Sequence, residues 1–263
     1  MTPIKNATIV YMKLDVDEHN KTLEYVHKVL EDSKINCLAC QREKATSKIF
    51  EKSDLIIIVG GDGTLLRTAH FFKDQLILGV NSYPAEKEGF FMRSTQEDFK
   101  EKLNRITSGK FKIQTLIRAG CRVNGYELPP AVNEYYFGYP KAYHVARYKM
   151  NFKNKTERHK SSGILVSTPQ GSHAWISSAG GEKMKLDRKE LQWLVREPYY
   201  GKVTIRGALA HGFLKKGETL KVISEMKGIG VIVADSTEKE YAIRENDELE
   251  FYISDKDLRM VEF

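Results

Sequence analysis

The chain has 263 residues, of which 41% are hydrophobic, enough for a buried core and too many for a disordered chain. This length suits one large domain or two smaller ones. The longest strongly apolar stretch, 55–61, is far shorter than the roughly 20 residues of a membrane-spanning helix. The first residues show no signal-peptide pattern, and three cysteines cannot build a disulfide framework. We therefore expect a cytoplasmic protein with no membrane association.

The charge balance is 42 Lys and Arg against 35 Asp and Glu, a net charge of +7. This surplus suits an anionic ligand such as a nucleotide or a polyphosphate. It is spread along the chain, and no nucleic-acid recognition motif accompanies it. We therefore expect small-molecule partners and no nucleic acid.

The first ninety residues alternate between strand and helix patterns. Strands are expected at 7–12, 35–39, 54–59 and 76–80, and helices at 18–33 and 64–73. The unbroken apolar run at 54–59 is typical of a central parallel strand that is covered on both faces. This alternation predicts an α/β N-terminal domain, doubly wound and Rossmann-like, that binds ligands at the carboxyl ends of its strands.

The pattern changes near residue 108. Before it, Ser94 and Glu97 have capping-box spacing, and a helix with Phe99, Leu103 and Ile106 on its apolar face follows. After it, strands are expected at 111–119, 121–123, 131–137, 143–152, 163–167, 203–206, 219–224, 228–234, 241–244 and 248–253. This series predicts a mostly antiparallel, β-rich C-terminal domain. We therefore place domains at 1–108 and 109–263, and the last segment can return to the first domain.

The strongest local signal is Gly-Gly-Asp-Gly-Thr at 60–64, between an apolar strand and a helix. Glycines let the backbone approach a phosphate closely, and the amides of the following helix point toward it. Asp62 follows the strand, where a carboxylate can bind Mg²⁺ or accept a proton from an attacking hydroxyl. A tight turn in which Asp62 caps the helix is the simpler alternative.

A second signal runs from 161 to 181, where an apolar strand leads into Thr-Pro-Gln-Gly-Ser and a short helix. Ser172 can cap that helix, and Gly180 can end it. The small residues of the helix would let a flat base lie against it, and Trp175 offers a face for stacking.

Two weaker signals leave alternatives open. Asn133 and Glu134 interrupt an apolar strand, where they can bind the two hydroxyls of a ribose or can be polar residues at a sheet edge. Asp235 follows another apolar strand, where it can reach a cleft or stabilise a turn.

The motifs at 60–64, 133–134 and 168–181, in this order and spacing, resemble those of the NAD kinases. The first is shared with diacylglycerol and sphingosine kinases, and the third narrows the match to NAD kinases. The resemblance covers nearly the whole chain and implies that the active site lies between an α/β domain and a β-rich domain. It implies phosphorylation of the adenosine-ribose 2′-hydroxyl of NAD, and possible use of NADH, with ATP or polyphosphate as donor and Mg²⁺ or another divalent cation.

Carried over residue by residue, the resemblance makes Asp62 the catalytic residue and assigns no protein residue as a metal ligand. The residues that it implies for binding NAD or the donor are Gly61, Gly63, Thr64, Arg67, Asn133, Glu134, Lys160, Ser162, Ser172, His173, Ala174, Trp175, Ser177 and Ser178. Asn133 and Glu134 would bind the ribose, and the segment 173–178 would pack against the adenine. We also expect a homo-oligomer, with a dimer favoured.

This chain departs from the common family pattern at Ser162, where most members have aspartate, and at His173 and Trp175. These departures resemble the branch that contains the mitochondrial NAD kinases of animals. An aspartate at position 162 would attract the positively charged nicotinamide ring of oxidised NAD. Serine removes that charge, so we expect weak discrimination between NAD and NADH.

Two other functions fit part of the sequence. A lipid kinase of the diacylglycerol or sphingosine type would explain 60–64 but not the segment at 172–178. A non-catalytic, NAD(P)-binding regulatory protein would keep the pocket without turnover, and an assay for NADP formation separates it from a kinase.

Overall fold

The computed structural model describes residues 3–201, 207–237 and 239–263. The chain divides into unit 1, Met1–Thr115 with Asp257–Phe263, and unit 2, Leu116–Lys256. The domain boundary expected at 108 falls inside unit 1, because strand β6 (Lys112–Leu116) belongs to the sheet of that unit. No helix in the described part of the chain is long and apolar enough to cross a membrane.

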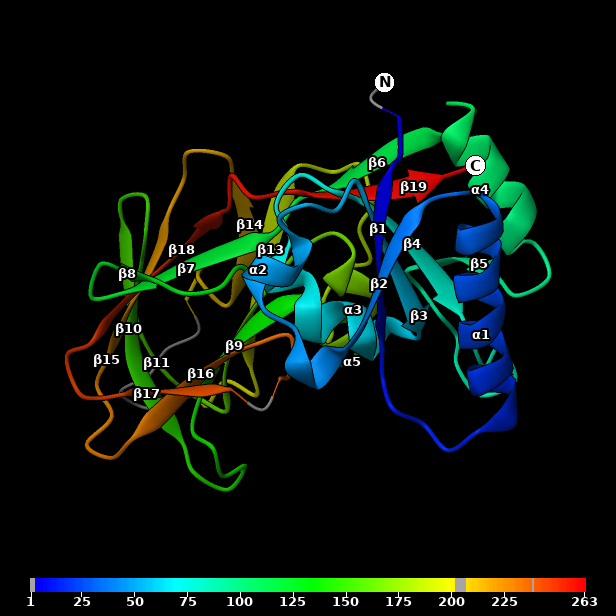
Figure 1. The fold of residues 1–263 in the computed structure, drawn as a ribbon. Helices are drawn as coiled ribbons and strands as arrows, with labels where there is room; N and C mark the ends of the chain where they lie inside the picture. The colour runs from blue at the N-terminus through cyan, green and yellow to red at the C-terminus, as the bar shows by residue number, and fades with distance from the viewer. Residues whose placement is uncertain (1–2, 202–206, 238) are drawn as a thin grey trace. The chain divides into compact units, whose positions relative to one another are not determined.

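Unit 1 is built on a seven-stranded sheet whose central strands are parallel (Figure 1). The strand order is β2-β1-β3-β4-β19-β6, with β5 paired to β4. The strands are β1 (Asn6–Tyr11), β2 (Asn36–Gln41), β3 (Leu55–Gly60), β4 (Leu76–Asn81), β5 (Met92–Thr95) and β19 (Leu258–Glu262). Every residue of β3 is buried, as its apolar run predicts. The C-terminal strand β19 pairs in parallel with β4, so the chain ends in the sheet where it began.

The helices of unit 1 pack their apolar faces on this sheet. Val26 and Leu30 of α1 and Leu103 of α4 join Ile57 of β3 in one buried cluster. The helical segments are α1 (Asp17–Asp32), η1 (Arg42–Lys44), α2 (Ser47–Phe50), α3 (Asp62–Thr68), η2 (Ala69–Phe71) and α4 (Phe99–Thr107). The helix expected at 64–73 is thus an α-helix that ends at Thr68 and continues as a short 3₁₀ turn.

The capping box expected at Ser94 and Glu97 is wrong. Ser94 lies in β5, because that strand pairs with β4, and α4 begins four residues later than the box requires, after Asp98. The Ser94 hydroxyl donates to Oδ1 of Asp98 at 2.7 Å, so the two residues contact each other in a turn before the helix.

Unit 2 consists of two six-stranded sheets whose strand pairs are antiparallel. The β10 sheet has the order β11-β10-β15-β18-β7-β8, and the β9 sheet has the order β14-β13-β12-β9-β16-β17. The bounds are β7 (Ala119–Val123), β8 (Tyr126–Glu127), β9 (Glu134–Gly138), β10 (Ala146–Phe152), β11 (Lys155–Ser161), β12 (Gly163–Ser167), η3 (Gly171–His173), α5 (Trp175–Ser178), β13 (Glu190–Arg196), β14 (His211–Lys215), β15 (Leu220–Ser224), β16 (Gly230–Ala234), β17 (Glu240–Ile243) and β18 (Glu248–Ile253). Tyr148 and Phe251 from the first sheet and Phe137 and Trp193 from the second share one core.

The predicted fold class, a parallel α/β part followed by an antiparallel β-rich part, is confirmed. The strands expected at 111–119 and 121–123 correspond to β6 and β7, with the break between them nearer to β6 than expected. The sequence did not predict β11, β13 and β14; β11 is a polar strand at the edge of its sheet and lacks an apolar alternation. The strand expected at 203–206 lies outside the described residues.

The burial of β3 predicts a large stability effect. Ile57 is fully buried, so Ile57→Ala should lower the free energy of unfolding by about 2–5 kcal/mol. Leu38→Ala, on an edge strand where the side chain is 51% exposed, should cost less than about 1 kcal/mol. Urea unfolding of both variants measures the difference, and equal losses would contradict this placement of the core.

Candidate functional site

The glycine loop, residues 60–64, connects the carboxyl end of β3 to α3 in unit 1. Gly60 has φ +154°, and a Cβ there would lie 2.9 Å from Oγ1 of Thr64, so the position favours glycine. A Cβ on Gly63 would meet nothing within 4 Å, so the backbone there is open to a ligand. A pocket of about 290 Å³ is lined by Met12, Arg42, residues 61–64 and residues 87–89.

The carboxylate of Asp62 is held by two successive backbone amides. The N–H of Phe90 donates to Oδ2 and the N–H of Phe91 donates to Oδ1, each at 2.9 Å. These bonds fix the plane of the carboxylate and leave lone pairs that can accept a proton or contact a cation. The alternative in which Asp62 caps the helix is wrong, because Gly61 occupies the cap position and the Asp62 side chain bonds elsewhere.

Two more predicted residues of unit 1 lie on α3. Thr64 is 1% exposed, and its Oγ1 is buried without a hydrogen-bond partner among the described residues. Arg67 lies further along the same helix. The pKa of Glu43 is lowered mainly by a hydrogen bond from Arg42 and also by the charge of Arg67, so both guanidinium groups lie near this carboxylate.

In unit 2, antiparallel pairing brings three strand ends to one edge of the β9 sheet. Glu134 begins β9 and is paired with Ser167, the last residue of β12. The N–H of Asp235, which follows β16, donates to the Glu134 carbonyl at 2.9 Å. The Asn-Glu pair, the segment after β12 and Asp235 therefore meet, although the sequence separates them by many residues.

The Asp235 side chain holds this edge together. Its carboxylate accepts the backbone N–H groups of Val132, Asn133 and Glu134 at 2.8, 2.6 and 3.3 Å. Asp235 and Ser236 have φ values of 54° and 50°, so they form a left-handed turn that directs the carboxylate inward. Asp235 thus both makes the turn and positions the Asn-Glu pair.

The two carboxyl groups at this edge ionise differently. Burial, with a contribution from the negative charge of Asp235, raises the pKa of Glu134 to about 8. Burial also raises the pKa of Asp235 to about 6, while the three amides and Arg118 act in the opposite direction. As pH rises, Asp235 is therefore expected to lose its proton before Glu134 does.

The Asn-Glu pair presents polar atoms that the described residues leave unsatisfied. Oδ1 of Asn133 and Oε2 of Glu134 are buried and have no hydrogen-bond partner among them. Buried polar atoms are costly unless a partner is supplied, so this edge is suited to a ligand with hydroxyl groups. A protonated Glu134 can donate to such a hydroxyl as well as accept from it.

The segment after β12 folds against this pair. A Cβ on Gly171 would lie 2.0 Å from the carbonyl oxygen of Asn133, so only glycine fits there. The Ser172 hydroxyl donates to the Pro169 carbonyl at 2.6 Å and accepts the N–H of Met184 at 2.7 Å. The expectation that Ser172 caps a helix is wrong, because it lies inside η3, separate from α5.

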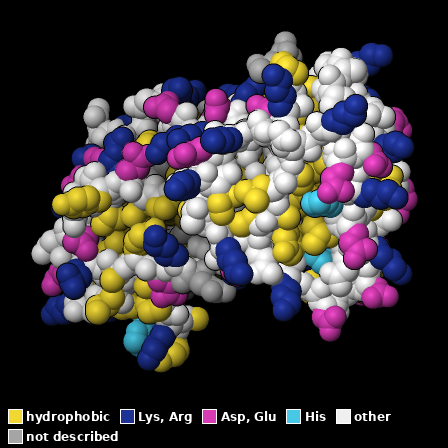
Figure 2. All heavy atoms as spheres, in the orientation of Figure 1, with side chains coloured by type: hydrophobic (Ala, Val, Ile, Leu, Met, Phe, Trp, Pro, Cys, Tyr) yellow, Lys and Arg dark blue, Asp and Glu magenta, His cyan; other side chains and the backbone are white. Residues whose placement is uncertain are grey.

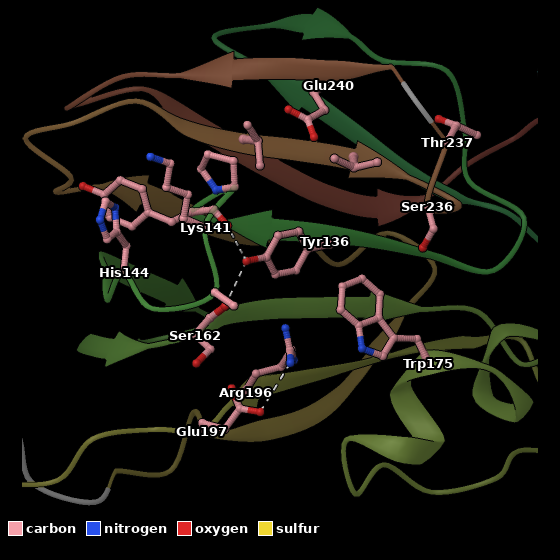
Figure 3. Close-up of a pocket in the computed structure, with 15 residues that line it drawn as sticks. Tyr136, Lys141, His144, Ser162, Trp175, Arg196, Glu197, Ser236, Thr237 and Glu240 are labelled. Carbon is pink, nitrogen blue, oxygen red and sulfur yellow. Dashed lines mark hydrogen bonds and ion pairs between the residues drawn. The ribbon is translucent and has the colours of Figure 1, made fainter.

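Next to this edge lies an aromatic pocket of about 450 Å³, formed by Tyr136, Ser162, Trp175, Arg196 and neighbouring residues (Figure 3). The rings of Tyr136 and Trp175 have centroids 5.2 Å apart. The Arg196 guanidinium lies 4.9 Å from the Trp175 ring. The Tyr136 hydroxyl donates to the Ser162 carbonyl at 3.0 Å, which fixes the tyrosine across the pocket.

The predicted residues of unit 2 are only partly brought together. Ser162 and Trp175 line the aromatic pocket, whereas Lys160 lies on β11 and is not among the residues that line it. The remaining predicted residues are His173 in η3, Ala174 between η3 and α5, and Ser177 and Ser178 in α5. Nε2 of His173 lies 3.1 Å from the Met184 carbonyl.

Tyr136 and Arg196 were missed at the sequence level. Tyr136 lies two residues after Glu134, so a strand beginning there places both side chains on one face. That period of two was a usable signal. The apolar pattern does not mark Arg196, which reaches the pocket through the pairing of β13 with β12.

The raised pKa of Glu134 predicts a pH dependence of stability. Between about pH 5 and pH 8 the folded chain binds this proton more tightly than the unfolded chain, so the free energy of unfolding should fall as pH rises. Glu134→Gln should reduce this fall by about 1–3 kcal/mol, whereas Glu245→Gln, at an exposed position, should not. Denaturant unfolding at pH 5 and at pH 8 tests this. An equal fall in the free energy of unfolding for the wild type and Glu134→Gln would contradict it.

Comparison with known proteins gives consistent matches. Residues 5–111 match the family model described as ATP-NAD kinase N-terminal domain. A probable NADH kinase of Oryza sativa subsp. japonica is 31% identical over 88% of this chain and 78% of its own length. An NADH kinase of Arabidopsis thaliana is 27% identical over 94% of this chain and 84% of its own length.

Two solved structures share the fold. Yeast NADH kinase in complex with NADH has a TM-score of 0.84 at 14% identity, covering 99% of this chain and 84% of that one. An NAD kinase from Archaeoglobus fulgidus in complex with ATP has a TM-score of 0.77 at 22% identity, covering 97% and 92%. At these identities the likeness concerns the fold.

Proposed function

Because the chain belongs to the NAD kinase family, we propose that it phosphorylates the adenosine-ribose 2′-hydroxyl of NAD or NADH to give NADP(H). ATP or polyphosphate would be the phosphoryl donor. Unit 1 would supply Asp62 and the phosphate-binding loop, and unit 2 would supply the binding site for the acceptor.

One observation supports this proposal more strongly than any other. Asn133 and Glu134 present two buried oxygens that have no partner in the described part of the chain, and Asp235 holds both residues in place through the backbone. A ribose offers two neighbouring hydroxyl groups, each of which can donate and accept a hydrogen bond. The pair is therefore suited to binding a ribose, and its burial makes those bonds worth more than in water.

In the reaction, Asp62 would orient the 2′-hydroxyl and accept its proton. The hydroxyl oxygen forms a bond to the terminal phosphorus of the donor, and the bond from that phosphorus to the bridging oxygen breaks. Phosphoryl transfer depends mainly on positioning and charge stabilisation. The amides of Phe90 and Phe91 hold the Asp62 carboxylate in one orientation, which is the positioning that this step requires.

A divalent cation fits this arrangement as a companion of the donor. Among the described residues, no group of three or more His, Cys, Asp or Glu side chains could hold a metal ion by itself. Asp62 and Glu88 both line the pocket of the glycine loop. Mg²⁺ is commonly bound by one or two carboxylates together with substrate phosphates, and it would neutralise phosphate charge there.

The aromatic pocket is proposed to take the nicotinamide half or the adenine ring of the acceptor. Tyr136 and Trp175 offer flat faces, and Ser162 lies in the same pocket. The contacts proposed for Lys160, Ser172 and residues 173–178 stay predictions. So do the homo-oligomeric state, with a dimer favoured, and the cytoplasmic location.

One assay tests the proposal. Purified protein would be incubated with NAD or NADH, crossed with ATP or polyphosphate in the presence of Mg²⁺, and NADP(H) formation would be measured. Product with at least one combination is expected. Binding of NAD without product would favour the regulatory protein, and phosphorylation of diacylglycerol or sphingosine instead would favour the lipid kinase.

Asp62→Asn should lower kcat by at least ~10²-fold, since the amide cannot act as a general base. Asparagine keeps the shape but can accept only one of the two amide bonds, so thermal unfolding should be recorded in parallel. Asp74→Asn, at an exposed position of the same unit, should keep full activity. A folded Asp62→Asn enzyme with wild-type kcat would remove Asp62 from the mechanism.

Ser162→Asp should shift the ratio of kcat/KM for NAD over NADH by about fivefold or more in favour of NAD. The new carboxylate would lie in the aromatic pocket, where it attracts the charged ring of oxidised nicotinamide. Ser162→Asn is the matched control, because asparagine has nearly the same size as aspartate but carries no charge. Steady-state kinetics with both cofactors measures the ratio, and equal ratios in the two variants would show that residue 162 does not sense ring charge.

A further inference from the structure

Two basic side chains, those of Arg42 and Lys87, converge on the glycine loop. Over the face drawn in Figure 2, Lys and Arg side chains are scattered among Asp and Glu. By contrast, Arg42 from η1 and Lys87 from the connection between β4 and β5 line the same pocket as residues 61–64.

The cationic groups of both residues lie beside one neutral sulfur. Nζ of Lys87 is 3.6 Å and Nη1 of Arg42 is 3.8 Å from Sδ of Met12. Arg42 is also paired with Glu43, whereas Lys87 has no ion pair among the described residues, and a thioether is too weak an acceptor to balance its charge. Burial and the charge of Arg42 both lower the pKa of Lys87. An anion placed between these groups would relieve both effects.

Lys87 lies on the connection between β4 and β5 that also supplies the amides bound to Asp62, and its own backbone is anchored. Nδ2 of Asn81 donates to the Lys87 carbonyl at 2.8 Å, and the amides of Phe90 and Phe91 bind Asp62. The Lys87 side chain crosses the glycine loop so closely that a Cβ on Gly61 would lie 3.0 Å from its Cδ. The lysine is therefore part of a built site.

The nearby acids set the kind of anion that can bind. Glu43 is paired with Arg42 at 2.6 Å, while the carboxylates of Asp62 and Glu88 line the pocket itself and would repel an anion. A divalent cation bound with the ligand would offset this repulsion, so the anion is expected to bind as its Mg²⁺ complex. The buried hydroxyl of Thr64, which has no hydrogen-bond partner among the described residues, adds a donor on the loop.

We propose that Arg42 and Lys87 bind the phosphate chain of the phosphoryl donor beside Asp62. This inference rests on the proposed function and adds to it the residues that recognise the donor. The pocket holds only about 290 Å³, and none of its lining residues is aromatic, so it offers no surface for stacking a base. The donor is thus recognised here through its phosphates.

Binding without the acceptor tests this directly. Calorimetry with Mg²⁺-tripolyphosphate and Mg²⁺-ATP, in the absence of NAD, should show affinities about tenfold to a hundredfold weaker for Arg42→Gln and for Lys87→Gln. Lys44→Gln, an exposed cation two residues from Arg42, is the matched control and should bind both ligands like the wild type. Tripolyphosphate and ATP should lose affinity by the same factor, since the base makes no contact in this pocket.

Kinetics separates this inference from the proposed function. In both variants KM for ATP should rise by a similar factor, while KM for NAD should change less than threefold. Wild-type affinity for tripolyphosphate in folded Arg42→Gln and Lys87→Gln would overturn the inference even if NADP(H) is formed. If the wild type forms no NADP(H) with any donor, but the two variants still lose tripolyphosphate binding, the proposed function would be overturned and the anion site would stand.

Discussion

A single buried carboxylate, that of Asp235, organises the edge of unit 2 on which the Asn-Glu pair lies. It satisfies three successive backbone amides that would otherwise be buried without partners, each at a cost of about 1–3 kcal/mol. Because these amides belong to residues 132–134, the carboxylate fixes the position of Asn133 and Glu134 where the chain enters β9. Burial chiefly, and the charge of Asp235 in addition, favour the protonated form of Glu134, so Asp235 fixes the geometry of the pair and contributes to its ionisation.

In unit 1 another carboxylate also accepts successive backbone amides, with a different consequence. Asp62 accepts two successive amides from the connection between β4 and β5, and that connection carries Lys87. The proposed general base and a proposed donor-binding cation are therefore linked through one connection of the chain, in which each is anchored by its own hydrogen bonds. A substitution at Asp62 changes chemistry and loop structure together, and only separate measurements of folding and turnover can distinguish these effects.

The buried polar atoms that the described residues leave unsatisfied include Thr64 Oγ1 in unit 1, and Asn133 Oδ1 and Glu134 Oε2 in unit 2. A folded chain normally pairs such atoms, because burying them alone costs free energy. These three lie on segments that the sequence motifs single out. A phosphate for the first and ribose hydroxyls for the others would supply the missing bonds, which is consistent with a kinase that binds two ligands.

The sequence by itself determined the parallel α/β part, its buried central strand and the glycine loop after that strand, because these depend on short-range patterns of apolar residues and glycines. It also placed Asn133 and Glu134 at a candidate site. Only the tertiary structure decided that Asp235 holds this pair, that the Ser172 hydroxyl is taken up by backbone groups, and that Arg42, Lys87 and Arg196 line pockets. These residues meet through strand pairing and loop anchoring between distant segments, and such long-range contacts leave no periodic signal in the local sequence.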